Sequence, residues 1–325
     1  MGFLAQYNKN VIFDEIQRVP SLFSYLQTKV DKDKINGQFI LTGSQHFLML
    51  KDVSQSLAGR IAIFNLYPFS LEELKNEHLQ EGDVFKQIWI GGYPRLFSSK
   101  IESSVWLGGY IQKYLERDIR TLSQISNLRV FENFLHLIAG RSGQLLDMLS
   151  LGNAIGVTHN TIRSWISLLE TSGIVFLLSP YLTNLGKRVV KTPKLYFLDT
   201  GLMCKLLEIS SHKQLPTHPL YGAIFETFVV SEYFKYISNH NTGSRLYFWR
   251  NRDGLEADLV VESGIKTDLY EIKSSQTVPV DPFDKTSKIR NLLKQDGKQY
   301  LIYSGKEKQN RSQGIIYPWL ETPML

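Results

Sequence analysis

The sequence predicts an α/β protein of several domains: a partial parallel sheet, then a helical region with a helix–turn–helix, then a second α/β region. Three observations predict this fold class. Apolar strand patterns alternate with helical patterns over the first 78 residues, an order typical of a parallel sheet. Small residues separate two helical patterns near residue 156, and acidic side chains interrupt two apolar strands near residues 258 and 271.

The composition excludes several classes of protein. The 325 residues are 43% hydrophobic and carry a net charge of +6, values typical of globular domains and only weakly suggestive of a polyanionic partner. Cys204 is the only cysteine, so an internal disulfide and a cysteine-rich zinc site are excluded. No apolar run reaches the roughly 18 residues that a membrane span needs. We therefore expect a cytoplasmic protein with no membrane partner.

Residues 1–78 carry the first candidate site, at the ends of two predicted strands. The strand patterns lie at 11–15, 37–45 and 61–70, with helical patterns at 22–30 and 46–60 between them. Asp14 and Glu15 end the first strand, and Ser44 and Gln45 end the second. In a nucleotide-hydrolysing sheet such acids hold Mg²⁺ and orient a water. They are also common as solvated caps of a strand, and the pattern leaves both interpretations open.

Residues 79–145 have mostly helical patterns, and residues 146–185 predict a winged helix–turn–helix. Ala154 and Gly156 provide the small residues that a helix–turn–helix needs for close approach and for the turn, and Thr158 can cap the second helix. In that helix a buried face is predicted from the spacing of Ile162, Trp165, Ile166 and Leu169. The outward face and the segment after the wing provide the candidate DNA-binding residues: His159, Asn160, Arg163, Lys187 and Arg188. A protein-docking role is the alternative.

Residues 186–325 carry the third candidate site, on two predicted strands at 256–261 and 268–273. Alternate side chains share one face of a strand, so Glu271 and Lys273 project together, and Asp258 can meet them from the partner strand. Two carboxylates that bind Mg²⁺ and a nearby lysine are sufficient for metal-assisted phosphodiester cleavage. A solvated hairpin is the alternative, but apolar neighbours make unpaired carboxylates costly there.

A resemblance to a known family follows from the order of several motifs. "VIFDEIQRVP", "FILTGSQ", "SLAGRIAIFNLYPFSLEEL" and "GGYPRLF", followed by "TPKLYFLDTGL" and "GAIFETFVVSEYFK", resemble bacterial and archaeal AAA-type P-loop ATPases. The resemblance implies that Asp14 and Glu15 are Walker B acids and that Ser44 or Gln45 is the sensor. It also implies that Arg60 is a conserved basic residue, and that 79–145 is a lid-like region.

A second resemblance concerns the carboxyl-terminal site. The spacing of Asp258, Glu271 and Lys273 is similar to that of the PD-(D/E)XK restriction-endonuclease-like superfamily. This similarity implies a supporting acid on the preceding helix, for which Glu226 is the first choice and Glu232 the second.

The sequence departs from the ATPase family because no G-x-x-x-x-G-K-S/T loop occurs in it. We therefore expect a partial P-loop-type sheet, with ATP as a cofactor only if the missing loop is supplied. The main functional expectation is a DNA-acting protein with a Mg²⁺-dependent nuclease-like domain. One alternative is a regulator that binds DNA or protein and has vestigial acid sites. Another is a nucleotide-dependent switch completed by another chain that supplies the loop. A protein partner and a homo-oligomer both stay open as partners.

Overall fold

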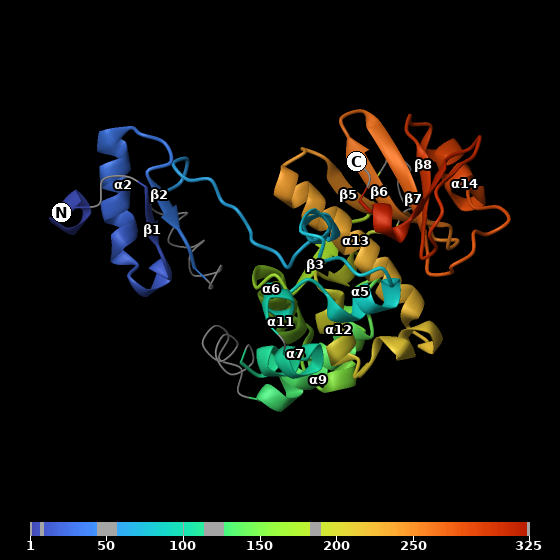
Figure 1. Cartoon of the computed structure of the whole chain (residues 1–325), viewed down its shortest axis with the longest axis horizontal. Helices are drawn as coiled ribbons and strands as arrows, with labels where there is room; N and C mark the ends of the chain where they lie inside the picture. The colour runs from blue at the N-terminus through green and yellow to red at the C-terminus, as the bar shows by residue number, and fades with distance from the viewer. Residues whose placement is uncertain are drawn as a thin grey trace. The chain divides into compact units, whose positions relative to one another are not determined.

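The structure is a computed structural model that describes residues 2–6, 10–43, 57–99, 101–113, 127–182 and 190–323. The chain divides into two units, Met1–Asn65 and Leu66–Leu325, and each is described by itself. Figure 1 shows both units with labels on many of their helices and strands. No helix among the described residues combines the length and the apolar character needed to cross a bilayer.

The first unit contains a two-stranded parallel sheet. β1 (Val11–Phe13) pairs in parallel with β2 (Phe39–Leu41), which confirms the first two predicted strands. The crossover between them is η1 (Ile16–Arg18) and α2 (Ser21–Asp33), after the short α1 (Gly2–Gln6). A small core of Leu4, Ile16, Phe23, Leu26 and Leu57 holds the unit together.

Two predictions for residues 46–70 have different outcomes. The predicted helix at 46–60 falls mostly on residues outside the described part of the chain. The predicted strand at 61–70 is wrong, because these residues form no strand. A strand requires a partner for its backbone N–H and C=O groups. Phe64 and Leu66 are instead 90% and 99% exposed, so this apolar segment lacks a covering element in the described structure.

The first part of the second unit is helical, as predicted for residues 79–145. Its helices are α4 (Leu71–Asn76), α5 (Val84–Ile90), α6 (Pro94–Ser98), α7 (Ser103–Lys113) and α9 (Leu128–Ala139). They share a continuous hydrophobic core with the elements that follow them. Further along the chain, after residues 148–197, come α12 (Thr200–Leu206) and η4 (His212–Thr217).

The predicted helix pair is present as α10 (Met148–Ile155) and α11 (His159–Thr171), followed by antiparallel β3 (Val175–Leu178) and β4 (Lys194–Phe197). Thr158 caps α11, since its hydroxyl accepts the Thr161 N–H at 3.1 Å. The four predicted core residues of α11 are all buried. Ala154, however, is exposed, and the close approach involves Gly152, where a Cβ would lie 2.7 Å from the Val157 oxygen.

The last part of the chain is a six-stranded mixed sheet in the order β5-β6-β7-β8-β10-β9. The strands are β5 (Arg245–Arg250), β6 (Glu256–Ser263), β7 (Lys266–Lys273), β8 (Gln299–Tyr303), β9 (Gln309–Asn310) and β10 (Ile315–Pro318), and η5 (Trp319–Glu321) follows. β5, β6 and β7 are antiparallel, whereas β7, β8 and β10 are parallel. Along the chain, one helix precedes β5, β6 and β7, a second helix lies between β7 and β8, and β9 and β10 follow.

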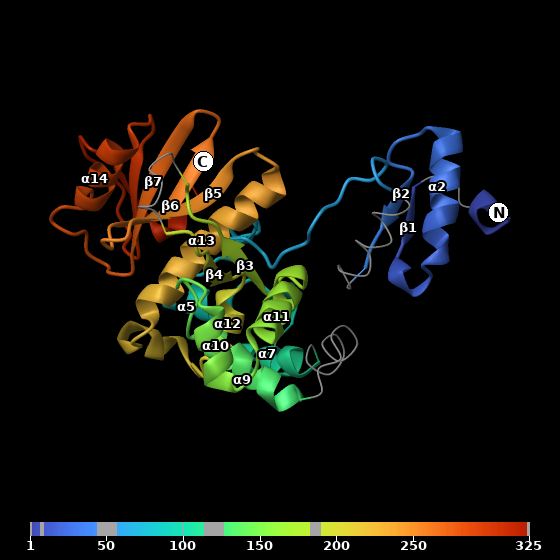
Figure 2. The same cartoon turned by 180° about the vertical axis from the view of Figure 1, so that it is seen from behind.

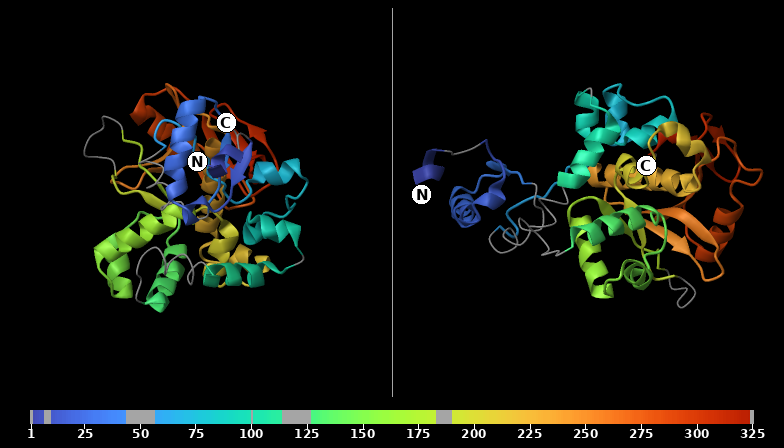
Figure 3. Two further views of the ribbon diagram at one scale, coloured as in Figure 1. Left: turned by 90° about the vertical axis from the view of Figure 1, so that its left-hand side faces the viewer. Right: turned by 90° about the horizontal axis from the view of Figure 1, so that it is seen from below.

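Two helices cover opposite faces of this sheet. α13 (Tyr221–His240) packs with Leu259 and Val261, and α14 (Asp284–Leu293) packs with Val260 and Leu269. This division follows from the alternation of side chains along a strand. Figures 2 and 3 show α13, in gold, lying between the sheet and the helical part of the unit. α13 thus brings one end of the sheet next to β4.

Candidate active site

A β-bulge positions Asp258. Between two β5–β6 pairs, Tyr247↔Val260 and Trp249↔Ala257, β5 advances by two residues and β6 by three. Such an extra residue locally redirects side chains, and bulges are frequent beside functional sites. Asp258 lies in the bulge, where its Oδ2 accepts the N–H of Ile272 on β7 at 2.7 Å. The bulge therefore directs Asp258 toward the end of β7.

Glu271 and Lys273 lie on one face of β7, as the alternation predicts. The Lys273 ammonium is 2.5 Å from Glu271 Oε1, and Lys285 of α14 contacts the same oxygen at 3.0 Å. Glu271 is only 3% exposed. Its other oxygen, Oε2, is buried and has no hydrogen-bond partner among the described residues. A buried carboxylate oxygen without a partner is costly, so a bound cation is an expected partner for it.

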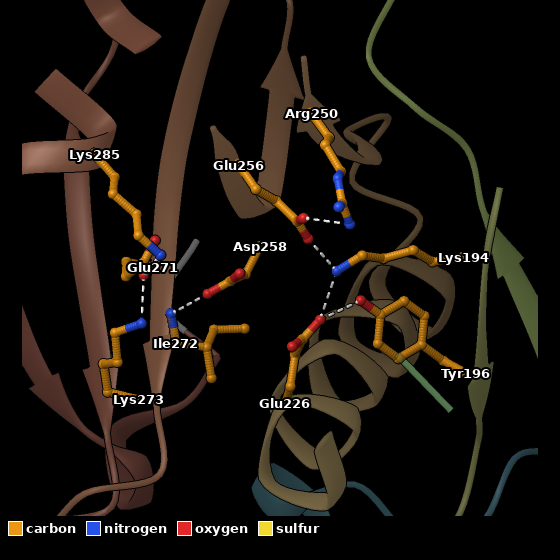
Figure 4. Close-up of polar contacts among 10 residues, drawn as sticks. All are labelled: Lys194, Tyr196, Glu226, Arg250, Glu256, Asp258, Glu271, Ile272, Lys273 and Lys285. Carbon is orange, nitrogen blue, oxygen red and sulfur yellow. Dashed lines mark hydrogen bonds and ion pairs between the residues drawn. The ribbon is translucent and has the colours of Figure 1, made fainter. Parts of the chain in front are cut away.

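A second group of charges lies on the other side of Asp258 (Figure 4). Glu226 of α13 and Glu256 of β6 both contact the Lys194 ammonium, at 2.9 and 2.5 Å. Glu226 also accepts the Tyr196 hydroxyl at 2.6 Å, and Glu256 pairs with Arg250 at 3.2 Å. We call the carboxylates of Glu226, Glu256, Asp258 and Glu271, together with the basic side chains that pair with them, the acidic cluster. Glu226, the predicted supporting acid, therefore belongs to it and is held there by two residues of β4.

The local electrostatics favour a protonated Asp258 when no cation is bound. Burial raises the pKa of Asp258 well above its ordinary value, and the carboxylates of Glu226 and Glu271 raise it further. For Lys194, burial disfavours the charged form, but Glu226 and Glu256 outweigh it and raise its pKa. The site thus combines an aspartate that resists ionisation with a lysine that stays charged.

Glu232, the second choice for a supporting acid, lies in a different environment. It pairs with Lys235 and accepts the Leu71 N–H at 2.6 Å, while Lys235 donates to the Phe69 oxygen at 3.0 Å. These contacts attach the start of α4 to α13. Glu232 is therefore part of the packing between helices and not of the acidic cluster.

In the first candidate site Asp14 is exposed and Glu15 is half-buried. Asp14 accepts the Thr42 hydroxyl, which links the ends of β1 and β2 as the parallel pairing predicts. Glu15 accepts the amide of Gln17 at 2.5 Å. Arg60 is engaged elsewhere, since it pairs with Asp31 at 2.5 Å. The predicted sensor residues Ser44 and Gln45 lie outside the described residues.

The candidate DNA-binding residues are described only in part. Asn160 and Arg163 are exposed on α11, and His159 at its start is half-buried. Lys187 and Arg188 lie outside the described residues. The Val190 N–H donates to the Arg250 oxygen at 3.0 Å, so the chain after that segment resumes beside β5.

Four charged residues of the acidic cluster were not predicted: Lys194, Arg250, Glu256 and Lys285. Glu256 had a signal, because it lies two residues before Asp258 at the start of a predicted strand. Lys285 is on α14 and Lys194 is on β4, each in a sequence context that resembles an ordinary surface lysine. Only the tertiary packing brings these two ammonium groups to the carboxylates.

Comparisons with known proteins cover most of the chain. The family model of an AAA domain matches residues 2–75, and two domains of unknown function match residues 81–213 (DUF8612) and 221–321 (DUF4143). Uncharacterized proteins of Mycobacterium tuberculosis and Mycobacterium bovis are each 30% identical over 309 residues, which are 94% of this chain and 67% of the relative. An uncharacterized protein of Methanocaldococcus jannaschii is 21% identical over 278 residues, 78% of this chain and 58% of that relative. The chain therefore belongs to the AAA-type family that includes these mycobacterial proteins.

Proposed function

We propose that this AAA-family protein acts on DNA and that residues 221–321 form a PD-(D/E)XK-type, Mg²⁺-dependent nuclease-like domain. The order of elements from α13 to β8, with Asp258 and Glu271 on adjacent antiparallel strands, supports this proposal. The observation that carries it is the buried Oε2 of Glu271, which has no partner among the described residues, in a carboxylate that interacts electrostatically with Asp258.

The residues present fit a magnesium ion. Among the described residues, no group of three or more His, Cys, Asp or Glu side chains has the geometry of a metal site. Mg²⁺ does not require such a cage, because it keeps several waters and uses one or two carboxylates. Asp258 and Glu271 provide that number, and a bound cation would relieve the cost of holding the half-buried Asp258 beside the buried Glu271. Binding would also deprotonate Asp258, so we expect metal affinity to rise with pH.

The protein side chains have separate roles in this proposal. The bound ion would polarise the phosphodiester and lower the pKa of a water. Lys273 lies on the same face as Glu271, where its ammonium can stabilise negative charge that develops on the phosphate. Glu226 is held by Lys194 and Tyr196, so it supports the cluster without directly binding the ion. ATP stays an expectation that depends on a phosphate-binding loop from outside these 325 residues.

Asp258→Asn and Glu271→Gln test the proposal, because each removes a carboxylate charge and keeps the side-chain shape. We expect the wild-type protein to nick supercoiled DNA with Mg²⁺ or Mn²⁺, and each variant to lose at least about a hundredfold in rate. Asp281→Asn, at an exposed aspartate of the same region, is the matched control and should nick as the wild type does. Nicking that survives in both site variants, or that persists in EDTA, would refute the assignment.

A second candidate function is supported by α11. Its exposed Asn160 and Arg163 follow a capped helix start, an arrangement that suits a DNA- or protein-docking helix. In this alternative the protein is a regulator and both acid sites are vestigial. DNA binding that depends on salt, without any metal-dependent nicking, would favour it.

A further inference from the structure

Two glutamates of the acidic cluster converge on a single atom. Glu226 comes from α13 and Glu256 from β6, yet both contact the Nζ of Lys194 (Figure 4). Lys194 is carried by β4, outside the six-stranded sheet, and is 3% exposed. Two carboxylates directed at one buried positive charge are the arrangement that a bound cation produces. Here an ammonium group of the protein occupies that position.

The charges of the cluster divide into two groups. Lys194 and Arg250 pair with the Glu226–Glu256 side, and Lys273 and Lys285 pair with Glu271. Asp258 lies between these groups and is held by a backbone N–H. Four neighbouring carboxylates would otherwise be enough for two divalent ions, as in two-metal phosphodiesterase sites.

We propose that Lys194 takes the place of a second metal ion and so restricts the site to one divalent cation, bound by Asp258 and Glu271. The inference rests on the proposed function. It also gives β4 a role in the site, because this strand carries the positive charge that keeps Glu226 and Glu256 from binding a second metal ion. Lys194 is a positioning residue in this proposal and does not touch the substrate.

Lys194→Met isolates the role of the ammonium. Methionine keeps an unbranched stem that can still pack against the Phe248 ring, whose centre is 5.5 Å from the lysine nitrogen. It leaves the half-buried carboxylates of Glu226 and Glu256 side by side without their shared cation, a costly state that a divalent ion can relieve. Removing the lysine should therefore create a second metal site between these two carboxylates.

The experiment is a calorimetric titration of the full-length chain with Mn²⁺. All proteins carry Asp14→Asn and Glu15→Gln, so that the first unit contributes no metal site. We expect one bound ion in the otherwise wild-type protein, two in Lys194→Met, and one again in Lys194→Met combined with Glu226→Gln. Mn²⁺ should also raise the melting temperature of Lys194→Met more than that of the protein with Lys194 intact. If Lys194→Met does not fold, Lys194→Gln replaces it, because its amide can still donate to one carboxylate.

The outcomes separate the two proposals. One ion in both the Lys194 protein and Lys194→Met would overturn the role of Lys194 and leave the nuclease-like site intact. Two ions bound to the protein that keeps Lys194 would also overturn the role of Lys194 and leave the nuclease-like site intact. No ion in the Lys194 protein but one in Lys194→Met would refute the nuclease-like site, while supporting Lys194 as the occupant of a cation position. No ion in either protein would refute both proposals.

Discussion

Glu271 has two oxygens in very different environments. Oε1 is shared by Lys273 and Lys285, whereas Oε2 is buried and has no partner among the described residues. Lys285 is the more exposed of the two lysines, with 52% of its side chain accessible against 38% for Lys273. Because it is exposed and on a flexible stem, Lys285 can leave Glu271 at little cost. We infer that it competes with a cation for this carboxylate.

Lys285→Met should therefore raise the affinity for Mn²⁺ by up to about fivefold, because an exposed ion pair is worth about 0.2–1 kcal/mol. Lys288→Met is the matched control. Lys288 lies on the same helix and pairs with Asp284 at 2.8 Å, away from Glu271, and its loss should leave affinity unchanged. Isothermal titration measures both variants. An affinity that falls in Lys285→Met would show that Lys285 helps to hold the ion.

The residues of the acidic cluster could be predicted to different degrees. Strand alternation placed Glu271 and Lys273 together, because that period is a property of the backbone. The bulge that holds Asp258 could not be predicted, since nothing in an apolar strand indicates where one extra residue is accommodated. Lys194 could not be predicted either, because it reaches the cluster through the packing of β4 against α13.

At the scale of elements, helix caps were the most predictable features and backbone contacts the least. Thr158 has the side chain of a capping residue and caps α11. The close approach between α10 and the turn depends on which face of α10 points inward. Gly152 and Ala154 are two residues apart on that helix and so lie on different sides, and the sequence interpretation chose the wrong one.

The cap of α12 gives a prediction at this scale. Asp199 is 3% exposed and accepts the N–H of Gly92 at 2.7 Å and of Leu202 at 2.8 Å, so it ties the end of α5 to the start of α12. Asp199→Ala should lower the free energy of unfolding by about 2–4 kcal/mol, because two buried donors lose their acceptor. Asp147→Ala is the control: it removes an exposed cap of α10 and should cost only about 1 kcal/mol.

The stabilisation by Asp199 should also depend on pH. Burial raises the pKa of Asp199, although the two N–H groups oppose this shift. A raised pKa means that the folded protein binds the proton more tightly than the unfolded chain does. The stability that this proton adds is therefore complete below the unfolded pKa of about 3.9, and it is lost as pH rises through the pKa of Asp199 in the folded protein. The difference between wild type and Asp199→Ala, measured by urea unfolding, should therefore be larger in acid than at neutral pH. An unchanged difference would contradict the raised pKa.

At the scale of the whole molecule, the second unit is held by one large continuous core and by two smaller clusters in its carboxyl-terminal part. That core includes Leu71 of α4, Ile166 of α11, Val229 of α13 and Trp319 near the chain end. Residues on both sides of the expected boundaries at 145 and 185 belong to it, for example Phe134, Leu178 and Leu195, and separate folding of these regions stays a prediction. Element types and their order could be predicted from local patterns. The continuity of the core could not, because it depends on long-range contacts that no local period reports.

The remaining question at this scale is whether the proposed contact with DNA would be made by α11 or by the acidic cluster. If α11 does so, Arg163→Ala should weaken DNA binding and lower the slope of log affinity against log salt by about 1, the value for one lost phosphate contact. Asp258→Asn should leave binding intact. Arg311→Ala, an exposed arginine beside β9, is the matched control and should change neither quantity. Fluorescence anisotropy over a range of salt concentrations measures all three variants. Equal effects of Arg163→Ala and Arg311→Ala would mean that α11 is not the DNA-binding surface, and α11 would then be a protein-docking helix or part of the packing.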